Sequence, residues 1–277
     1  MEILRRFLDL PDGQIHYREA GSNTAPKLLM LHASPGSSKQ LEPLISIMAR
    51  AFHVIAPDTM GNGDSTAPPQ DSPEIADYAE VMIAFIDNLG IENTHLYGTH
   101  TGARIATDLA LRHGGRIDRL ILDGFGLYTP QSLDQILEVY APEIQLDQQG
   151  LHILKVWQLC RDQYIWFPWF KKEAVRRVPH DLPDAEFLHN KFVEVIKGVK
   201  SYHKSYLAAF RYSMREYVPM LKHRTLITCA ENDLVRGDFD EAATLLSSAD
   251  SCSLPGTRSE GAAIETAKYF TQFLNGK

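Results

Sequence analysis

Short apolar runs alternate along this chain with longer stretches in which apolar residues recur every three or four positions. The runs are rich in Leu, Ile and Val, which is typical of strands buried on both faces of a parallel sheet. They lie at residues 14–19, 27–32, 53–58, 94–99, 120–123, 225–230 and 251–255. This order of runs and periodic stretches predicts an α/β protein with a mostly parallel sheet flanked by helices.

Two of the periodic stretches show the helical pattern most clearly. The first places apolar residues on one face from Ile75 to Leu89 and ends at Gly90, a residue type that often follows a helix. The second runs from Ile264 to Leu274, close to the C-terminus. Both patterns predict amphipathic helices whose apolar faces pack against the core of the protein.

The alternation stops between Asp123 and Thr225, where about a hundred residues contain no clear strand and are too many for a plain loop. Helical patterns and prolines fill this stretch, and all three tryptophans lie in it. We expect a helical cap at residues 126–220 inserted into a core formed by residues 1–125 and 221–277. The cap should cover the carboxyl ends of the strands, where open α/β sheets bind ligands.

The composition narrows the class of protein. The 277 residues are 44% hydrophobic and 23% charged, as in ordinary globular domains, and the net charge of −7 argues against a nucleic-acid-binding surface. Three cysteines without a CxxC spacing exclude a disulfide scaffold. The first residues lack the apolar segment of a signal peptide, and no apolar run is long enough for a membrane span. We therefore expect a cytoplasmic protein without a membrane partner.

Three loops that follow three of the predicted strands have a recognisable form. They read HASPG at residues 32–36, PDTMGNGDS at 57–65 and GTHTG at 98–102, the last between a strand and a helix. Together they resemble the α/β-hydrolase family, with its HG-x-PG oxyanion loop, its PD-x-x-G-x-G-x-S loop and its nucleophile elbow G-x-S-x-G. The resemblance extends over nearly the whole chain. It implies the α/β-hydrolase fold with a helical cap and implies no cofactor.

The resemblance also implies a catalytic order of nucleophile, acid and histidine, and this chain departs from it at two of the three positions. His100 stands in the place of the nucleophile. Asp233 matches the acid, since it follows the run at 225–230. No histidine occurs after His223, and the loop expected to hold one reads GTRSE at 256–260. A standard Ser-His-Asp triad cannot be assembled from these positions.

His100 is the residue on which a catalytic hypothesis depends. An imidazole titrates near neutral pH, so it can serve as a general base and, less often, as a nucleophile. The elbow requires strained backbone angles, which His tolerates better than most residues, and the flanking Gly98 and Gly102 permit the tight turn. The alternative is that His100 is an inert relic in a protein that only binds a ligand.

Ser34 and Thr101 are candidates for stabilising an oxyanion. Their backbone N–H groups stand where the resemblance implies the oxyanion hole, and we favour this role for Ser34. The Ser34 hydroxyl could instead act as a nucleophile activated by His100, with Asp233 or Asp123 orienting the histidine. Both interpretations of Ser34 stay open at this point.

Five further residues are expected to line the substrate pocket: His32, Asp123, Trp166, Trp169 and Arg258. Asp123 is also an alternative acid, and Arg258 could hold a substrate carboxylate or could be a surface residue. The two tryptophans form either a hydrophobic pocket wall or the core of the cap. No pair of histidines has the spacing of a metal motif and no Gly-rich loop has the dinucleotide form, so we expect neither a metal nor a cofactor.

The sequence favours an enzyme over a binding protein, since the oxyanion loop and a titratable His100 are both present. The expected substrate is a small, largely apolar carbonyl compound such as an ester or a lactone. The alternatives are a lyase, hydratase or isomerase that needs only a base, and an inactive ligand-binding protein. A small molecule is the expected partner, and the sequence also allows a homodimer.

Overall fold

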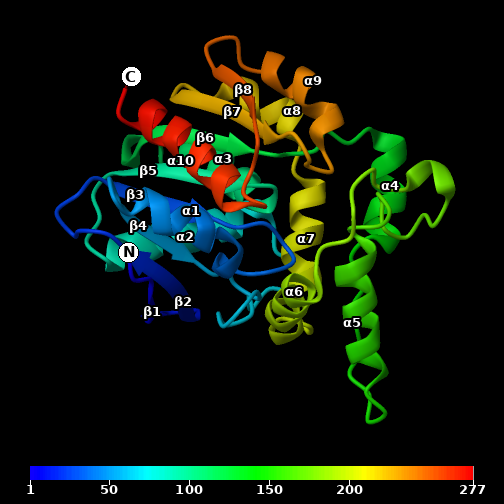
Figure 1. The fold of residues 1–277 in the computed structure, drawn as a ribbon. Helices are drawn as coiled ribbons and strands as arrows, with labels where there is room; N and C mark the ends of the chain where they lie inside the picture. The colour runs from blue at the N-terminus through cyan, green and yellow to red at the C-terminus, as the bar shows by residue number, and fades with distance from the viewer. Residues whose placement is uncertain (277) are drawn as a thin grey trace.

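The computed structural model describes residues 1–276 and shows one eight-stranded sheet with helices on both faces (Figure 1). The strand order is β1-β2-β4-β3-β5-β6-β7-β8. The strands from β3 to β8 are parallel, and β2 pairs antiparallel with both β1 and β4. Their bounds are β1 Leu4–Leu10, β2 Gly13–Ala20, β3 Lys27–Leu31, β4 His53–Pro57, β5 Thr94–Thr99, β6 Ile117–Asp123, β7 Arg224–Ala230 and β8 Asp250–Leu254. The predicted fold class is confirmed.

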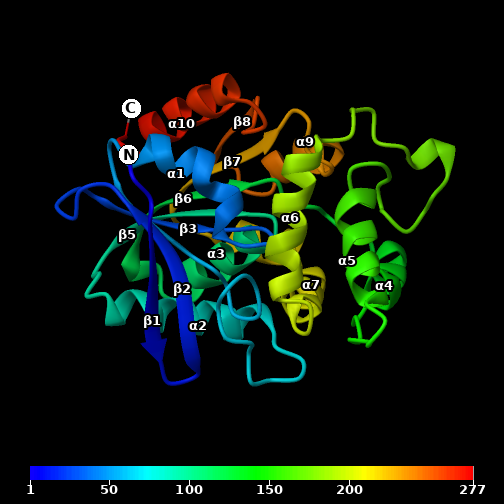
Figure 2. The ribbon, with the colours of Figure 1, turned by 60° about the horizontal axis from the view of Figure 1, so that its bottom comes forward.

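Side chains of the central strands alternate between two apolar layers because successive residues of a strand point to opposite faces. In β3, Leu29 and Leu31 pack in one layer while Leu28 and Met30 pack in the other. Figure 2 shows that α1 and α10 cover one face of the sheet, and α2 and α3 the other. These helices are α1 Glu42–Met48, α2 Ile75–Asn88, α3 Thr101–Arg112 and α10 Glu260–Leu274.

Each of the seven apolar runs corresponds to a strand, but the sequence pattern missed β1. This strand forms the edge of the sheet, and its first four residues are exposed, so it has no continuous apolar run. It pairs with β2 in a hairpin whose turn leads into Gly13, a glycine with φ of +129°. The Asp12-Gly13 dipeptide was the available signal, since this pair favours hairpin turns.

Five helices lie between β6 and β7, in the stretch where no strand was expected. They are α4 Pro130–Val139, α5 Leu151–Asp162, α6 Ala185–Lys197, α7 Tyr202–Arg211 and α8 Met214–Tyr217. Two apolar clusters hold α4 to α7 together, and both use Trp169 and Tyr206. Figure 1 shows these four helices gathered beside one edge of the sheet, with α5 projecting from the rest. The division into a core and a cap remains a prediction.

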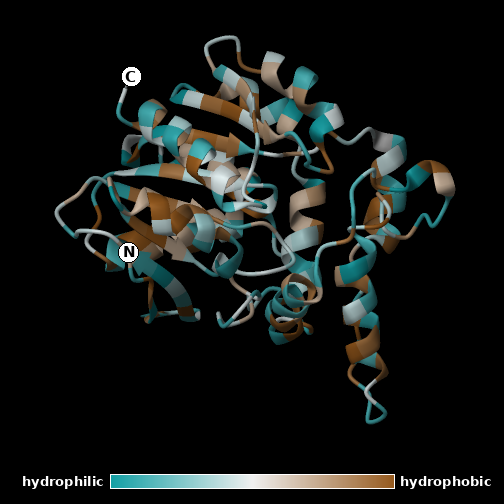
Figure 3. Ribbon diagram, viewed as in Figure 1, coloured by the Kyte–Doolittle hydropathy of each residue, from teal (hydrophilic) through white to brown (hydrophobic). Residues whose placement is uncertain are grey.

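Hydrophobic residues, coloured brown in Figure 3, occur at the start of α5. Leu151, Ile153 and Leu154 are each about half exposed. Within residues 1–276 the structure has no helix long and apolar enough to cross a membrane.

Candidate active site

His100 lies in a sharp turn between β5 and α3, and its backbone is strained. Its φ of 50° and ψ of −106° make it the one non-glycine residue with a positive φ in the described part of the chain. A Cβ on Gly98 would come within 2.2 Å of the Gly102 carbonyl oxygen, and one on Gly102 within 2.2 Å of the Leu31 carbonyl oxygen. Only glycines allow such close approach, so both are needed to form this elbow.

The His100 imidazole is held by Asp233, which follows β7. Because an ionised carboxylate can only accept, the His100 Nε2–H donates to Asp233 Oδ2 at 2.9 Å. Asp233 is fixed in turn, since its Oδ1 accepts the Val235 N–H at 2.9 Å. The Nδ1 of His100 has no protein partner within residues 1–276, and the side chain is 34% exposed. This arrangement leaves a nitrogen lone pair available on the open side of the ring.

Burial and charge act in opposite directions on this pair. Burial alone would lower the pKa of His100, but the Asp233 carboxylate outweighs it and raises the pKa above the ordinary value of 6.5. Burial would likewise raise the pKa of Asp233, but the charge of His100 and the bonds from His100 and Val235 hold it below its usual value. Asp233 is therefore ionised at neutral pH and ready to stabilise an imidazolium.

Asp123 stands next to the pair but does not bond His100 through its side chain. It ends β6, its carbonyl oxygen accepts the His100 backbone N–H at 3.1 Å, and its Oδ2 accepts the Tyr97 hydroxyl at 2.7 Å. Burial raises the pKa of Asp123 to about 6, although the bond from Tyr97 opposes this. Of the two candidate acids, Asp233 is the one that orients the histidine.

A cavity of about 600 Å³ lies between the strand ends and the helices α6 and α7. Its lining includes six of the predicted site residues, together with aromatic residues from the stretch between β6 and β7. The six are Ser34, His100, Thr101, Asp123, Asp233 and Arg258. The aromatic part consists of Tyr128, Tyr140, Tyr164, Phe167, Phe187, Tyr206 and Phe210.

The Ser34 side chain is turned toward the cap and away from the histidine. Its hydroxyl shares a 2.9 Å hydrogen bond with the Ser205 hydroxyl, which also accepts from the Asn62 amide at 3.0 Å. Ser34 is 5% exposed and makes no hydrogen bond to His100 within the described chain. This geometry favours the interpretation in which the backbone of Ser34 matters and its hydroxyl does not. Thr101 opens α3, whose first N–H groups have no side-chain cap.

Three predicted pocket residues lie outside the cavity lining, contrary to expectation. His32 is fully buried beneath it, where Nδ1–H donates to the Ala33 carbonyl and Nε2 accepts the Thr59 N–H, each at 2.9 Å. Trp169 packs inside the cap and donates to the Tyr140 carbonyl at 2.9 Å. Trp166 forms an isolated bridge with Arg177. Each of these side chains stabilises local structure, so spacing along the chain misplaced them.

Arg104 lines the cavity but was not recognised from the sequence. It is 3% exposed and lies one turn into α3, where it donates to the carbonyls of His100 at 3.2 Å and Gly126 at 2.9 Å. Its guanidinium also lies over the Tyr128 ring, 5.6 Å from the centroid. A charged residue within the otherwise small and apolar start of α3 was the signal that could have revealed it.

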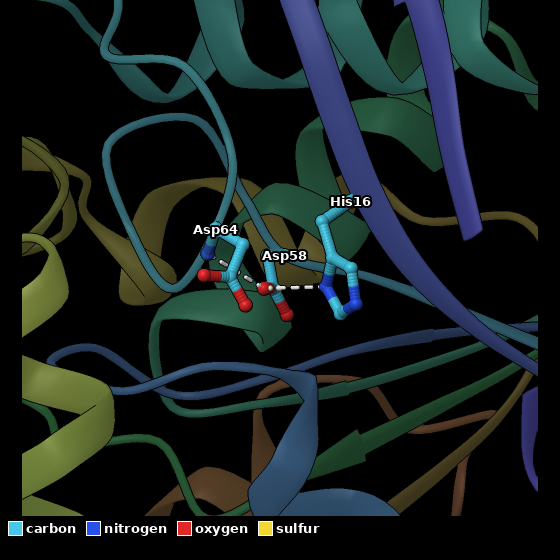
Figure 4. A group of neighbouring side chains, drawn as sticks. All are labelled: His16, Asp58 and Asp64. Carbon is cyan, nitrogen blue, oxygen red and sulfur yellow. Dashed lines mark hydrogen bonds and ion pairs between the residues drawn. The ribbon is translucent and has the colours of Figure 1, made fainter. Parts of the chain in front are cut away.

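A second histidine–aspartate cluster joins β2 to the loop that follows β4 (Figure 4). His16, Asp58 and Asp64 bring possible metal ligands close together, but the atoms of His16 and Asp58 are occupied by hydrogen bonds. His16 Nδ1–H donates to Asp58 Oδ2 at 2.8 Å, and Arg5 donates to Nε2 at 3.2 Å. Asp58 also accepts from the backbone of Ser38 at 2.8 Å and of Asp64 at 3.1 Å. This cluster fixes the 57–65 loop.

Comparison with known proteins shows which families and structures this chain is similar to. A family model described as alpha/beta hydrolase fold matches residues 26–153. An uncharacterized hydrolase of Saccharomyces cerevisiae is 33% identical over 129 residues, covering 46% of this chain and 44% of the yeast protein. A carboxylesterase of Bacillus subtilis is 31% identical over 110 residues, covering 40% of this chain and 37% of that protein. The enol-lactonase from Burkholderia xenovorans has a crystal structure with a TM-score of 0.72 at 21% identity, covering 98% of this chain and 100% of that one.

The matched region contains all three loops from which the resemblance was predicted. Each of the two relatives is matched over less than half of its own length. The likeness to the lactonase structure spans nearly the whole chain and establishes the fold. This chain therefore has the α/β-hydrolase fold and resembles that family, with His100 at the position of the elbow nucleophile.

Proposed function

We propose that this chain is an enzyme that hydrolyses a small, largely apolar ester or lactone without a cofactor, with His100 as the general base. The observation that carries the proposal is the bond from His100 Nε2 to Asp233, which leaves Nδ1 without a protein partner in a residue that lines the 600 Å³ cavity. The carboxylesterase relative supports an ester substrate. The aromatic lining supports a largely apolar one.

In the proposed reaction, neutral His100 takes a proton from water through Nδ1 as the water attacks the substrate carbonyl. Asp233 stabilises the imidazolium that forms, in the manner of an acid that stays ionised throughout. Backbone N–H groups of Thr101 and Ser34 stabilise the oxyanion. The tetrahedral intermediate then collapses, and His100 returns the proton to the leaving alkoxide. His100 can alternatively attack as a nucleophile through the same Nδ1, giving an acyl-imidazole that water hydrolyses.

A proton-transfer reaction is the second candidate, and one observation favours it. Asp123 lines the same cavity, and its pKa is raised to about 6, so a fraction of its carboxyl groups is protonated near neutral pH. A base and an acid beside one substrate suit elimination, hydration or isomerisation. In that case substrates without an ester bond would turn over, and the products would identify the reaction.

The proposal is tested with a panel of small esters and lactones, comparing wild type with His100→Ala. Loss of general base catalysis should lower kcat/KM by about 10²–10⁴-fold. The matched control is His113→Ala. His113 follows α3, bonds Glu80 and does not line the cavity. Full turnover by His100→Ala would refute the role of His100.

Serine-directed fluorophosphonate labelling separates this proposal from ordinary serine hydrolysis. Wild type should stay unlabelled because the Ser34 hydroxyl bonds Ser205. Trapping with hydroxylamine distinguishes base from nucleophile, since only the nucleophilic route forms an acyl-enzyme. A cytoplasmic location and a homodimer remain predictions, and sedimentation at several protein concentrations tests the second.

A further inference from the structure

Arg104 is a buried cation without a counter-ion. Its side chain belongs to a residue only 3% exposed, and no carboxylate within residues 1–276 lies within 4 Å of it. Only the face of the Tyr128 ring and two backbone carbonyls partly compensate for its positive charge. Taking a guanidinium out of water is costly unless charge and hydrogen bonds compensate for the lost hydration.

The hydrogen-bonding capacity of Arg104 is also largely unused. A guanidinium has five N–H donors, and two are bonded here, to the carbonyls of His100 and Gly126. Its Nε is buried without any partner. The carboxylate of Asp238, which acts on Arg104 from farther away, accepts the Leu127 N–H at 2.8 Å. Apart from the Tyr128 phenol, which also acts as a partner of the guanidinium, no group within residues 1–276 takes the remaining donors, and Nε keeps none.

Neighbouring groups cannot supply the missing negative charge. Tyr128 and Tyr206 line the cavity beside Arg104, and burial raises the pKa of both phenols, so they stay neutral. Neutral phenols are themselves hydrogen-bond donors. The cavity acids, by contrast, are bonded within the protein: Asp233 to His100, Asp123 to Tyr97, Glu194 to Lys197 and Glu42 to Arg18.

Two further cations face the same cavity without an ion pair in the described chain. Lys191 on α6 donates to the Pro35 carbonyl, and Arg258, which follows β8, lies over the Tyr164 ring at 5.9 Å. Three cations without a carboxylate within 4 Å thus line the cavity, from α3, from α6 and from the loop after β8. An anionic group of a ligand can contact them directly.

We propose that the ligand of this cavity carries a carboxylate, and that Arg104 binds it through its unused N–H donors. This inference rests on the proposed function for the location of the substrate and adds its chemical class: a small aromatic or aliphatic acid with the reacting carbonyl near His100. The planar guanidinium can grip a carboxylate through two parallel hydrogen bonds, which makes Arg suited to this task. Arg104 and His100 are four residues apart, so both groups of one small substrate can be reached.

Binding without turnover tests the inference. The probes are benzoate, 3-phenylpropionate and hexanoate, each paired with its primary amide, measured by calorimetry on wild type. At least one carboxylate should bind about tenfold more tightly than its amide, because bonds to a charged group are the stronger ones. Equal affinity within all three pairs would overturn the inference.

Variants show whether Arg104 is the group responsible. Arg104→Gln should weaken carboxylate binding about tenfold or more and leave amide binding unchanged. Arg112→Gln is the matched control, because Arg112 lies on the same helix but pairs with Asp108 and does not line the cavity. Unchanged carboxylate affinity in folded Arg104→Gln would overturn the inference. Should Arg104→Gln fail to fold, Arg104→Lys keeps the charge but loses the planar fork and should still weaken carboxylate binding.

The outcomes also separate this inference from the proposed function. Turnover of neutral esters with no preference for carboxylates would refute the inference and leave the role of His100 intact. Tight carboxylate binding through Arg104 by a chain that turns over no substrate would support the inference and refute the proposed function.

Discussion

The protein contains two buried histidine–aspartate pairs of nearly equal bond length, and they differ in what surrounds the imidazole. His16 Nδ1 lies 2.8 Å from Asp58, and both side chains are fully buried. His100 Nε2 lies 2.9 Å from Asp233, but these side chains are 34% and 15% exposed. The second nitrogen of His16 accepts from Arg5, while that of His100, a residue that lines the cavity, has no protein partner within residues 1–276.

The contrast shows that the pair itself does not make a catalytic site. In the first pair, every nitrogen and oxygen has a partner, so the bond stabilises the 57–65 loop against β2. In the second, one ring nitrogen stays available and the strained elbow presents it to a cavity. The same two residue types therefore support structure in one place and, in the mechanism we propose, proton transfer in the other.

The largest expected effect comes from Asp58→Asn. Removing one charge of a fully buried pair leaves the other groups unmatched, so the free energy of unfolding should fall by about 3–5 kcal/mol. Chemical denaturation measures the change, and the activity of the folded fraction should stay close to wild type. A selective loss of turnover with unchanged stability would contradict the structural role of this pair.

The matched substitution in the other pair, Asp233→Asn, should have the opposite pattern. The imidazolium loses its stabilising charge and His100 loses its orientation, so kcat/KM should fall by about 10²-fold or more. The free energy of unfolding should change by only about 1 kcal/mol, since the pair is partly exposed. Stability loss equal to that of Asp58→Asn, with normal turnover, would remove the distinction between the two pairs.

The two pairs should also separate along the pH axis. The pKa of His100 is raised above 6.5, and the proposed base is the neutral form, so kcat/KM should fall about tenfold per pH unit below that raised pKa. The pKa of Asp58 is held far below its usual value of 3.8 by the bonds from His16 and Ser38, which outweigh burial. Its contribution to stability is therefore present above pH 3.8 and is lost only as pH falls through the depressed pKa.

Activity and circular dichroism recorded from pH 4 to pH 9 check this separation. As the pH is lowered, turnover should disappear while the circular dichroism signal of the folded protein persists. In Asp233→Asn the inflection of the activity profile should move to lower pH, since burial then lowers the pKa of His100 and only the weaker effect of Asp123 opposes it. Loss of activity that coincides with unfolding in both proteins would contradict the prediction.

The smallest expected effect is that of Ser34→Ala. Its hydroxyl bonds Ser205 and not His100, so kcat/KM should change by less than about threefold, within the range of a lost neutral hydrogen bond. Ser205→Ala is the control that removes the other end of this bond. A fall of a hundredfold in Ser34→Ala alone would instead favour the hypothesis in which Ser34 is the nucleophile.

Loop forms and the positions of most strands along the chain were predictable from the sequence because local chemistry determines them. Glycine is required at positions 98 and 102 because a Cβ there would lie 2.2 Å from a backbone oxygen. The position of Asp233 was predicted because it follows the apolar run that forms β7. The edge strand β1 was missed because an exposed strand has no apolar run. Its hairpin partner β2 was predicted because it is largely buried.

Contacts between distant parts of the chain were not predictable from spacing. The expected tryptophan wall was wrong because Trp169 bonds Tyr140 inside the cap, and His32 was misplaced because its ring bonds Thr59 below the cavity. Which ring nitrogen of His100 stays without a partner depends on the side from which Asp233 contacts the ring. Arg104 went unnoticed because its lack of a counter-ion is visible only in three dimensions.

The position of Asp233 has a consequence for how such a site can change over evolutionary time. It holds an imidazole that comes from the elbow, whereas the family resemblance implies an imidazole that comes from the loop after the last strand. In this chain Asp233 bonds the imidazole of the elbow, and the 256–260 loop contains no histidine. The position of the acid therefore suits an imidazole from either place, so a change at these two positions need not alter the sheet or the elbow glycines.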